Sequence, residues 1–255
     1  MMSTNLLFPI IQDGEGTPVF LVPSAGATPF TLVQLARSLR LQRPVYSFEF
    51  AGMEEGRSVH TSIEEMAAAY LGELRTVQET GPYNIGGHCV GGLVAYDIAA
   101  KIEAEGDSVA ALILLESFPP FKDKVAKDLD QANERILSSD VLIETEKAYQ
   151  FATVQIQEQL SRLPPKYAKR FGRFCGEQLA MGKRYRATPI RAPITLLRTS
   201  THLGMVFQDW KAYSAGGFTE QVVTGTSFSM LNPPNVGFLG ERLDKVLSTP
   251  QSRRH

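Results

Sequence analysis

Short apolar runs alternate with helical patterns along the first half of the chain, and this order restricts the fold more than any other feature of the sequence. Residues 18–23 read Pro-Val-Phe-Leu-Val-Pro, a continuous apolar run of the kind that fills a strand buried on both faces of a sheet. A helical pattern follows at about 30–39 and another strand-like run at 44–50. Because parallel strands need a crossover connection, this order predicts a mostly parallel sheet with helices on both faces, a three-layer α/β/α architecture of the α/β class. The other expected strands are 6–11, 83–87, 110–115, 194–198 and 220–223, and the other expected helices are 91–105, 235–247 and one that opens at a capping box at 61–65 and runs to 74.

The pattern changes between residues 121 and 186. Charged residues and glutamine become more frequent there, no strand-like run appears, and the segments 141–160 and 165–184 have helical periodicity. We therefore expect a single domain over residues 1–255, with a helical insertion at 121–186 that forms a lid over the site. The alternative is that these helices merely continue the scaffold.

The composition excludes several classes of protein. The net charge of −1 shows no bias toward nucleic acid or an anionic membrane, and no apolar stretch approaches the roughly 20 residues that span a bilayer. The two cysteines, Cys89 and Cys175, form no disulfide framework and have no metal-ligand spacing. We therefore expect a cytoplasmic protein that binds no metal, nucleic acid or membrane.

The segment Gly87-His88-Cys89-Val90-Gly91 carries the chemistry, because it has the Gly-x-Ser-x-Gly pattern with cysteine in place of serine. Small residues must flank such a nucleophile, since the strand turns sharply into a helix at a strained central residue. The helix N-terminus beneath the thiol is expected to lower the pKa of Cys89. The alternative is that Cys89 is a small buried apolar residue, which is the role we expect for Cys175. We expect the ring of His88 to point away along the strand and to serve in packing.

Residues 81–92, Gly-Pro-Tyr-Asn-Ile-Gly-Gly-His-Cys-Val-Gly-Gly, resemble the thioesterase domains that release products from polyketide synthases and nonribosomal peptide synthetases. Residues 62–67 share the resemblance, which extends from the loop at Pro23 to residues 233–236. It implies an α/β-hydrolase fold, no cofactor of the protein's own, and a substrate carried on the phosphopantetheine arm of an acyl or peptidyl carrier protein. Such domains usually have serine at the elbow, and a minority have cysteine.

The resemblance also implies positions for the acid and the oxyanion hole. The acid lies just after the strand that follows the elbow helix, where this chain has Glu116 and the family usually has aspartate. A solvated strand-end glutamate is the alternative interpretation of Glu116, and Asp209 is the alternative acid. The backbone N–H groups of Val90 and Ala25 are the expected oxyanion donors.

The base of the family lies in a motif resembling Gly-x-His-Phe-x-Met-Leu, whereas residues 225–231 here read Gly-Thr-Ser-Phe-Ser-Met-Leu. Ser227 therefore stands at the position of the base histidine. The chain is an engineered variant that traps substrate, a natural enzyme with a weakened or relocated base, or a catalytically inactive relative that binds acyl chains or a partner. His202 is the candidate for a relocated base, and a surface-loop histidine is the alternative.

These observations predict a thioesterase that releases a polyketide or peptidyl chain through an acyl-S-Cys89 intermediate, with lactone formation favoured because a thioester reacts well with internal nucleophiles. Hydrolytic or editing release, or noncatalytic binding, are the alternatives. An ordinary lipase or esterase is disfavoured, since the acid follows the wrong strand for most of them. The chain opens with Met1-Met2 and contains no carrier-domain serine motif, so we expect the carrier protein to act in trans.

Overall fold

The computed structural model describes residues 6–53, 58–120, 161–200 and 207–248, and its centre is a seven-stranded sheet. The strand order is β1-β3-β2-β4-β5-β6-β7. Among these described strands, only β1 runs antiparallel to its neighbour, β3, so the mostly parallel sheet is confirmed. The strands are β1 Leu7–Ile11, β2 Val19–Val22, β3 Val45–Phe48, β4 Tyr83–His88, β5 Val109–Leu115, β6 Ile194–Thr199 and β7 Phe218–Val223.

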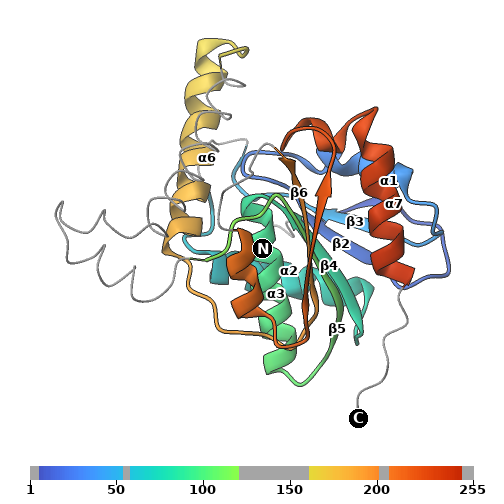
Figure 1. Cartoon of the computed structure of the whole chain (residues 1–255). Helices are drawn as coiled ribbons and strands as arrows, with labels where there is room; N and C mark the ends of the chain where they lie inside the picture. Colours follow the sequence, from blue (N-terminus) through green and yellow to red (C-terminus); the bar gives the residue numbers. More distant parts are fainter. Residues whose placement is uncertain (1–5, 54–57, 121–160, 201–206, 249–255) are drawn as a thin grey trace.

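Helices cover both faces of this sheet, as the alternating sequence pattern predicts (Figure 1). On one face, α2 (Ile63–Val77) and α3 (Val90–Ala104) enclose one apolar core. On the other, α1 (Val33–Ser38) and α7 (Asn235–Ser248) enclose a second. Every residue of β2 and β5 is buried, which explains why both strands read as unbroken apolar runs.

The start of α2 confirms the predicted capping box. The Ser62 hydroxyl accepts the Glu65 N–H at 3.1 Å, and the Glu65 carboxylate accepts the Thr61 N–H at 2.7 Å. Three 3₁₀ segments complete the described elements: η1 Pro29–Leu32, η3 Phe207–Tyr213 and η4 Ser229–Leu231. No helix in the described part of the chain has the length and apolar character needed to cross a bilayer.

The segment 121–186 contains α6 (Pro165–Arg184), which has the predicted bounds and lies on the α2–α3 side of the molecule in Figure 1. Its buried side chains include Phe174, which contacts the Phe50 ring edge-on at 6.1 Å between centroids. At its end, the Tyr185 hydroxyl donates to the Asp97 carboxylate of α3 at 2.9 Å. The helix expected at 141–160 lies outside the described residues, and the lid role stays a prediction.

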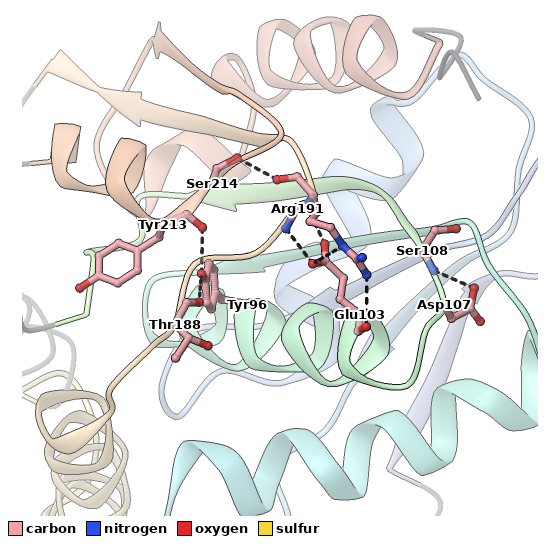
Figure 2. Close-up of polar contacts among 9 residues, drawn as sticks. Tyr96, Glu103, Asp107, Ser108, Thr188, Arg191, Tyr213 and Ser214 are labelled. Atoms are coloured by element: carbon pink, nitrogen blue, oxygen red, sulfur yellow. Dashed lines mark hydrogen bonds and ion pairs between the residues drawn. The ribbon is translucent and has the colours of Figure 1, made fainter. Parts of the chain in front are cut away.

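Polar contacts fasten the segment between α6 and β6 to helix α3 (Figure 2). The Glu103 carboxylate accepts the backbone N–H groups of Arg191 and Ala192 at 2.7 and 2.6 Å. The Tyr96 hydroxyl lies within hydrogen-bond distance of the carbonyl oxygens of Thr188 and Tyr213, at 2.6 and 2.9 Å. These contacts lead the chain from α6 into β6, whose first residue, Ile194, pairs with Leu112 in the middle of β5.

Candidate active site

Strand β4 ends in a strained turn at Cys89. The residue has φ 54° and ψ −122°, and α3 begins at the next residue, Val90. A positive φ is unfavourable for a side chain with a Cβ atom and persists only where the surroundings enforce it. Here the Cys89 N–H donates to the Leu115 carbonyl of β5 at 2.9 Å. The structure therefore has the strand–turn–helix elbow that the sequence motif predicts.

The glycines of the elbow are required by space. A Cβ atom at Gly87 would lie 2.1 Å from the Gly91 carbonyl oxygen, and one at Gly91 would lie 2.2 Å from the Pro23 carbonyl oxygen. A Cβ at Gly92 would lie 2.2 Å from the Ser117 hydroxyl oxygen. Three segments of backbone approach one another at the elbow: the end of β4, the start of α3 and the residue after β2. Only glycine, which has no Cβ atom, allows such a close approach.

The environment of the Cys89 thiol differs from the expectation. The side chain is half-buried. Burial raises the pKa of its thiol to about 11, with a smaller contribution from the charge of Glu116, although a hydrogen bond from the Val90 N–H opposes the rise. The predicted lowering of this pKa is wrong, because desolvation outweighs the donor at the helix start. The thiol is therefore almost entirely protonated at pH 7.

Glu116 lies at the end of β5, next to the elbow. It is 1% exposed and has φ 48°, so its interpretation as a solvated strand-end residue is wrong. Its N–H donates to the Leu197 carbonyl at 2.9 Å, and its carboxylate accepts the N–H of Thr199, where β6 ends. The charge of Glu116 acts on both Cys89 and His88. Asp209 falls within η3, in a separate element.

Ser227 lies in the loop after β7, and its neighbour is an imidazole. The Ser227 hydroxyl oxygen is 3.5 Å from Nε2 of His88. Burial lowers the pKa of His88 to about 4, against opposing effects of the Glu116 charge and a hydrogen bond to the Ser227 backbone. The ring is therefore neutral at pH 7, and it is a weak base. His202, the expected relocated base, lies outside the described residues.

The alternation of residues along β4 is the sequence signal that places His88. Tyr83 and Ile85 face the α2–α3 core, so the alternation of a strand places His88 on the opposite face. The chain returns to that face between β7 and α7, which is where Ser227 lies. The ring is buried as expected for a packing residue, but it faces Ser227, the position that the sequence resemblance assigns to the base.

The turn Ser24–Ala27 follows β2 and abuts the elbow. The Ala27 N–H donates to the Ser24 carbonyl at 2.9 Å, which closes the turn. A Cβ atom at Gly91 would lie 2.2 Å from the Pro23 carbonyl oxygen, so the turn that contains Ala25 and the helix start that contains Val90 are neighbours. Cys175 of α6 is buried as predicted, and its sulfur lies 3.7 Å from the Ala25 carbonyl oxygen.

A mostly parallel sheet between two helical layers, with a strained residue between β4 and α3, defines the α/β-hydrolase fold. Within that class, the chain belongs to the thioesterase domain family, whose family model matches residues 17–245. The family that the elbow resembles is thus confirmed.

Two curated relatives are synthetases. Atromentin synthetase greA of Suillus grevillei is 34% identical over 119 residues, which are 47% of this chain and 12% of the relative. Malpinin synthetase of Mortierella alpina is 30% identical over 129 residues, which are 51% of this chain and 2% of the relative. This chain therefore spans only a small part of these proteins.

Among solved structures, the Vlm2 thioesterase domain bound with a dodecadepsipeptide matches along almost the whole chain. It is 27% identical, and the match covers 97% of this chain and 99% of that one with a TM-score of 0.70. The fold of this chain is therefore that of a thioesterase domain along almost its whole length.

Proposed function

We propose that this protein releases a peptidyl or polyketide chain from the phosphopantetheine thioester of a carrier protein by way of an acyl-S-Cys89 intermediate. The observation that carries the proposal is the strained, half-buried Cys89 at the elbow, in contact with the Val90 N–H and next to the Ser24–Ala27 turn. This arrangement presents one nucleophile to the thioester carbonyl of the substrate. The oxyanion that develops on this carbonyl can accept hydrogen bonds from backbone N–H groups.

The first step is thiol–thioester exchange. The Cys89 sulfur attacks the thioester carbonyl carbon, the carbonyl oxygen becomes an oxyanion stabilised by the N–H groups of Val90 and Ala25, and the bond to the pantetheine sulfur breaks. The proton lost by Cys89 ends on the departing thiolate. Because one thioester replaces another, the step is close to isoenergetic, and a thiol retains some nucleophilicity without a base whereas a hydroxyl does not.

The second step favours an internal nucleophile over water. Of the imidazoles in the described part of the chain, the one beside Ser227 is that of His88, whose pKa of about 4 makes it a poor activator of water. A hydroxyl of the acyl chain held next to the thioester has a high effective concentration. Its attack on the acyl carbonyl forms a lactone and returns the Cys89 thiol. The depsipeptide bound by Vlm2 supports a chain of this chemical kind.

Intact-mass measurement with a synthetic acyl-pantetheine thioester tests the proposal. We expect the wild type to gain the mass of the acyl group and Cys89→Ala to gain none. A hydroxyacyl substrate is expected to give lactone as the main product, and exclusively linear acid would contradict the lactone preference. A separately expressed carrier loaded with the same chain tests the expectation that the carrier acts in trans.

A second candidate function is binding of an acyl chain without turnover. It is favoured by serine at the position of the base and by the high pKa of the Cys89 thiol, about 11. The same experiment separates the two. Saturable binding of the thioester without an adduct at Cys89 would favour the binder.

A further inference from the structure

The turn Ser24–Ala27 has a conformation that depends on its central peptide group. Gly26, the third residue of the turn, has φ 71°, which is typical of a type II turn. Types I and II differ by a flip of the peptide between the second and third residues, here the Ala25 carbonyl and the Gly26 N–H. The direction of that carbonyl therefore reports which conformer the turn adopts.

Helix α6 contacts this peptide through Cys175. The Cys175 sulfur lies 3.7 Å from the Ala25 carbonyl oxygen, within the range of an S–H donor. The same sulfur lies 2.3 Å from the place that a Cβ atom at Gly26 would occupy, and Phe171 lies 3.0 Å from it. The fit therefore requires glycine in the turn, and Cys175 places a small donor side chain of α6 against the Ala25 carbonyl.

The thiol of Cys175 is suited to donate and unsuited to react. It is 2% exposed, and burial raises its pKa to about 12, with a further rise from the neighbouring Cys89 thiol. It is therefore protonated at every physiological pH and keeps its hydrogen for the Ala25 carbonyl. A buried protonated thiol is a poor nucleophile.

We propose that Cys175 is a positioning residue for the oxyanion hole: by holding the Ala25–Gly26 peptide it fixes the conformation of the Ser24–Ala27 turn, and with it the direction of the Ala25 N–H, the donor that this turn contributes to the acyl carbonyl on Cys89. The inference rests on the proposed function, because it assigns a role in stabilising the oxyanion of that reaction. It also gives α6 a function, since the helix that contacts the turn sets the conformation that the chemistry uses.

Two reactions of Cys89 separate positioning from packing. Acylation by a thioester passes through an oxyanion, whereas alkylation by iodoacetamide needs the thiolate but forms no oxyanion. We expect Cys175→Ala to slow acylation by about tenfold, a fraction of the effect of deleting an oxyanion donor, with KM little changed. Alkylation of Cys89 is expected to keep the wild-type rate. Cys175→Ser, which retains a donor, is expected to recover acylation to within about threefold of the wild type.

Gly176→Ala, on the same helix, is the matched control, because a Cβ atom there would have no neighbouring atom within 4 Å. Equal acylation rates in Cys175→Ala and the wild type would overturn the positioning role, as would equal slowing of acylation and alkylation in both Cys175 variants. Failure of the proposed function has a different signature: the wild type would be alkylated at Cys89 but never acylated.

Discussion

The elbow and the loop that follows β7 lie at the same site, yet only the first retains the residues of its chemistry. At the elbow, the strained Cys89, the buried Glu116 and the close-packed glycines are all present. In the loop at 224–231, serine occupies the position that the sequence resemblance assigns to the base.

The loop nevertheless keeps its shape. Gly225 has φ 99°, the Thr226 N–H donates to the Ser229 hydroxyl at 2.8 Å, and the Met230 N–H donates to the Thr226 carbonyl at 2.9 Å. None of these contacts uses the side chain of residue 227. Shape and chemistry are therefore separable in the loop, whereas at the elbow the same residues serve both.

Removing the nucleophile is expected to have the largest effect. Cys89→Ala should lower thioester acylation by at least about 10⁴-fold, the scale of losing a nucleophile in a triad enzyme. Cys89→Ser should lose almost as much, because a hydroxyl without an effective base is nearly inert. Single-turnover acylation followed by intact mass measures both. If Cys89→Ser kept a tenth of the wild-type acylation rate, an effective base would be present. The contrast between the elbow and the loop after β7 would then be wrong.

Restoring the imidazole is the next largest effect. Ser227→His would place a ring beside His88, in the region where Glu116 also acts, and we expect hydrolysis of the acyl enzyme to rise by about 10²- to 10³-fold. Deacylation rates from stopped-flow or quenched samples give the readout. Ser227→Ala is the control and should behave as the wild type. Adding Glu116→Gln to Ser227→His should cancel most of this gain in hydrolysis. An unchanged rate in a folded Ser227→His protein would contradict the interpretation of position 227 as the site of the base.

The contrast also marks what the sequence could predict. Unbroken apolar runs specified β2 and β5, the Ser62 to Glu65 spacing specified the start of α2, and the spacing of Gly87 and Gly91 specified the elbow. Each of these signals is local, because burial, capping and a sharp turn are written in residues close together along the chain.

The features that escaped prediction depend on distant parts of the chain. Ser227 and His88 are 139 residues apart in sequence, and Cys175 and Ala25 are 150 apart. The predicted shift in the pKa of Cys89 is wrong in direction for the same reason, since the desolvation that raises this pKa comes from tertiary burial. The helix start beneath Cys89 is visible in the sequence, but the burial around its thiol is not.

The pH dependence of Cys89 sharpens the comparison further. Because the thiolate is the reactive form and the pKa is raised to about 11, the alkylation rate should rise about tenfold per pH unit from pH 7 toward that value. His88, with a pKa of about 4, should add no step between pH 5 and 8. Iodoacetamide rates across pH 6 to 10 check this. A plateau above pH 8 would mean that the thiol ionises far more readily than its burial indicates.

The smallest effects concern stability, and they test whether the elbow is the less tolerant region. Gly92→Ala would drive a methyl group to 2.2 Å from the Ser117 hydroxyl and 2.4 Å from its Cβ, so we expect a loss of about 1–3 kcal/mol in the free energy of unfolding. Ser227→Ala should stay within about 0.5 kcal/mol of the wild type, because the contact of its hydroxyl with His88 Nε2 is long, 3.5 Å, and the turn contacts of the loop do not use this side chain. Denaturant unfolding measures both. Combining Gly92→Ala with Ser117→Gly removes the atoms that collide, so the double variant should lose less than the sum of the two single losses. If the two losses in unfolding free energy simply added, the collision with Ser117 would not be the cause of the Gly92→Ala loss. Glycine at position 92 would then matter less for the fold than this collision indicates.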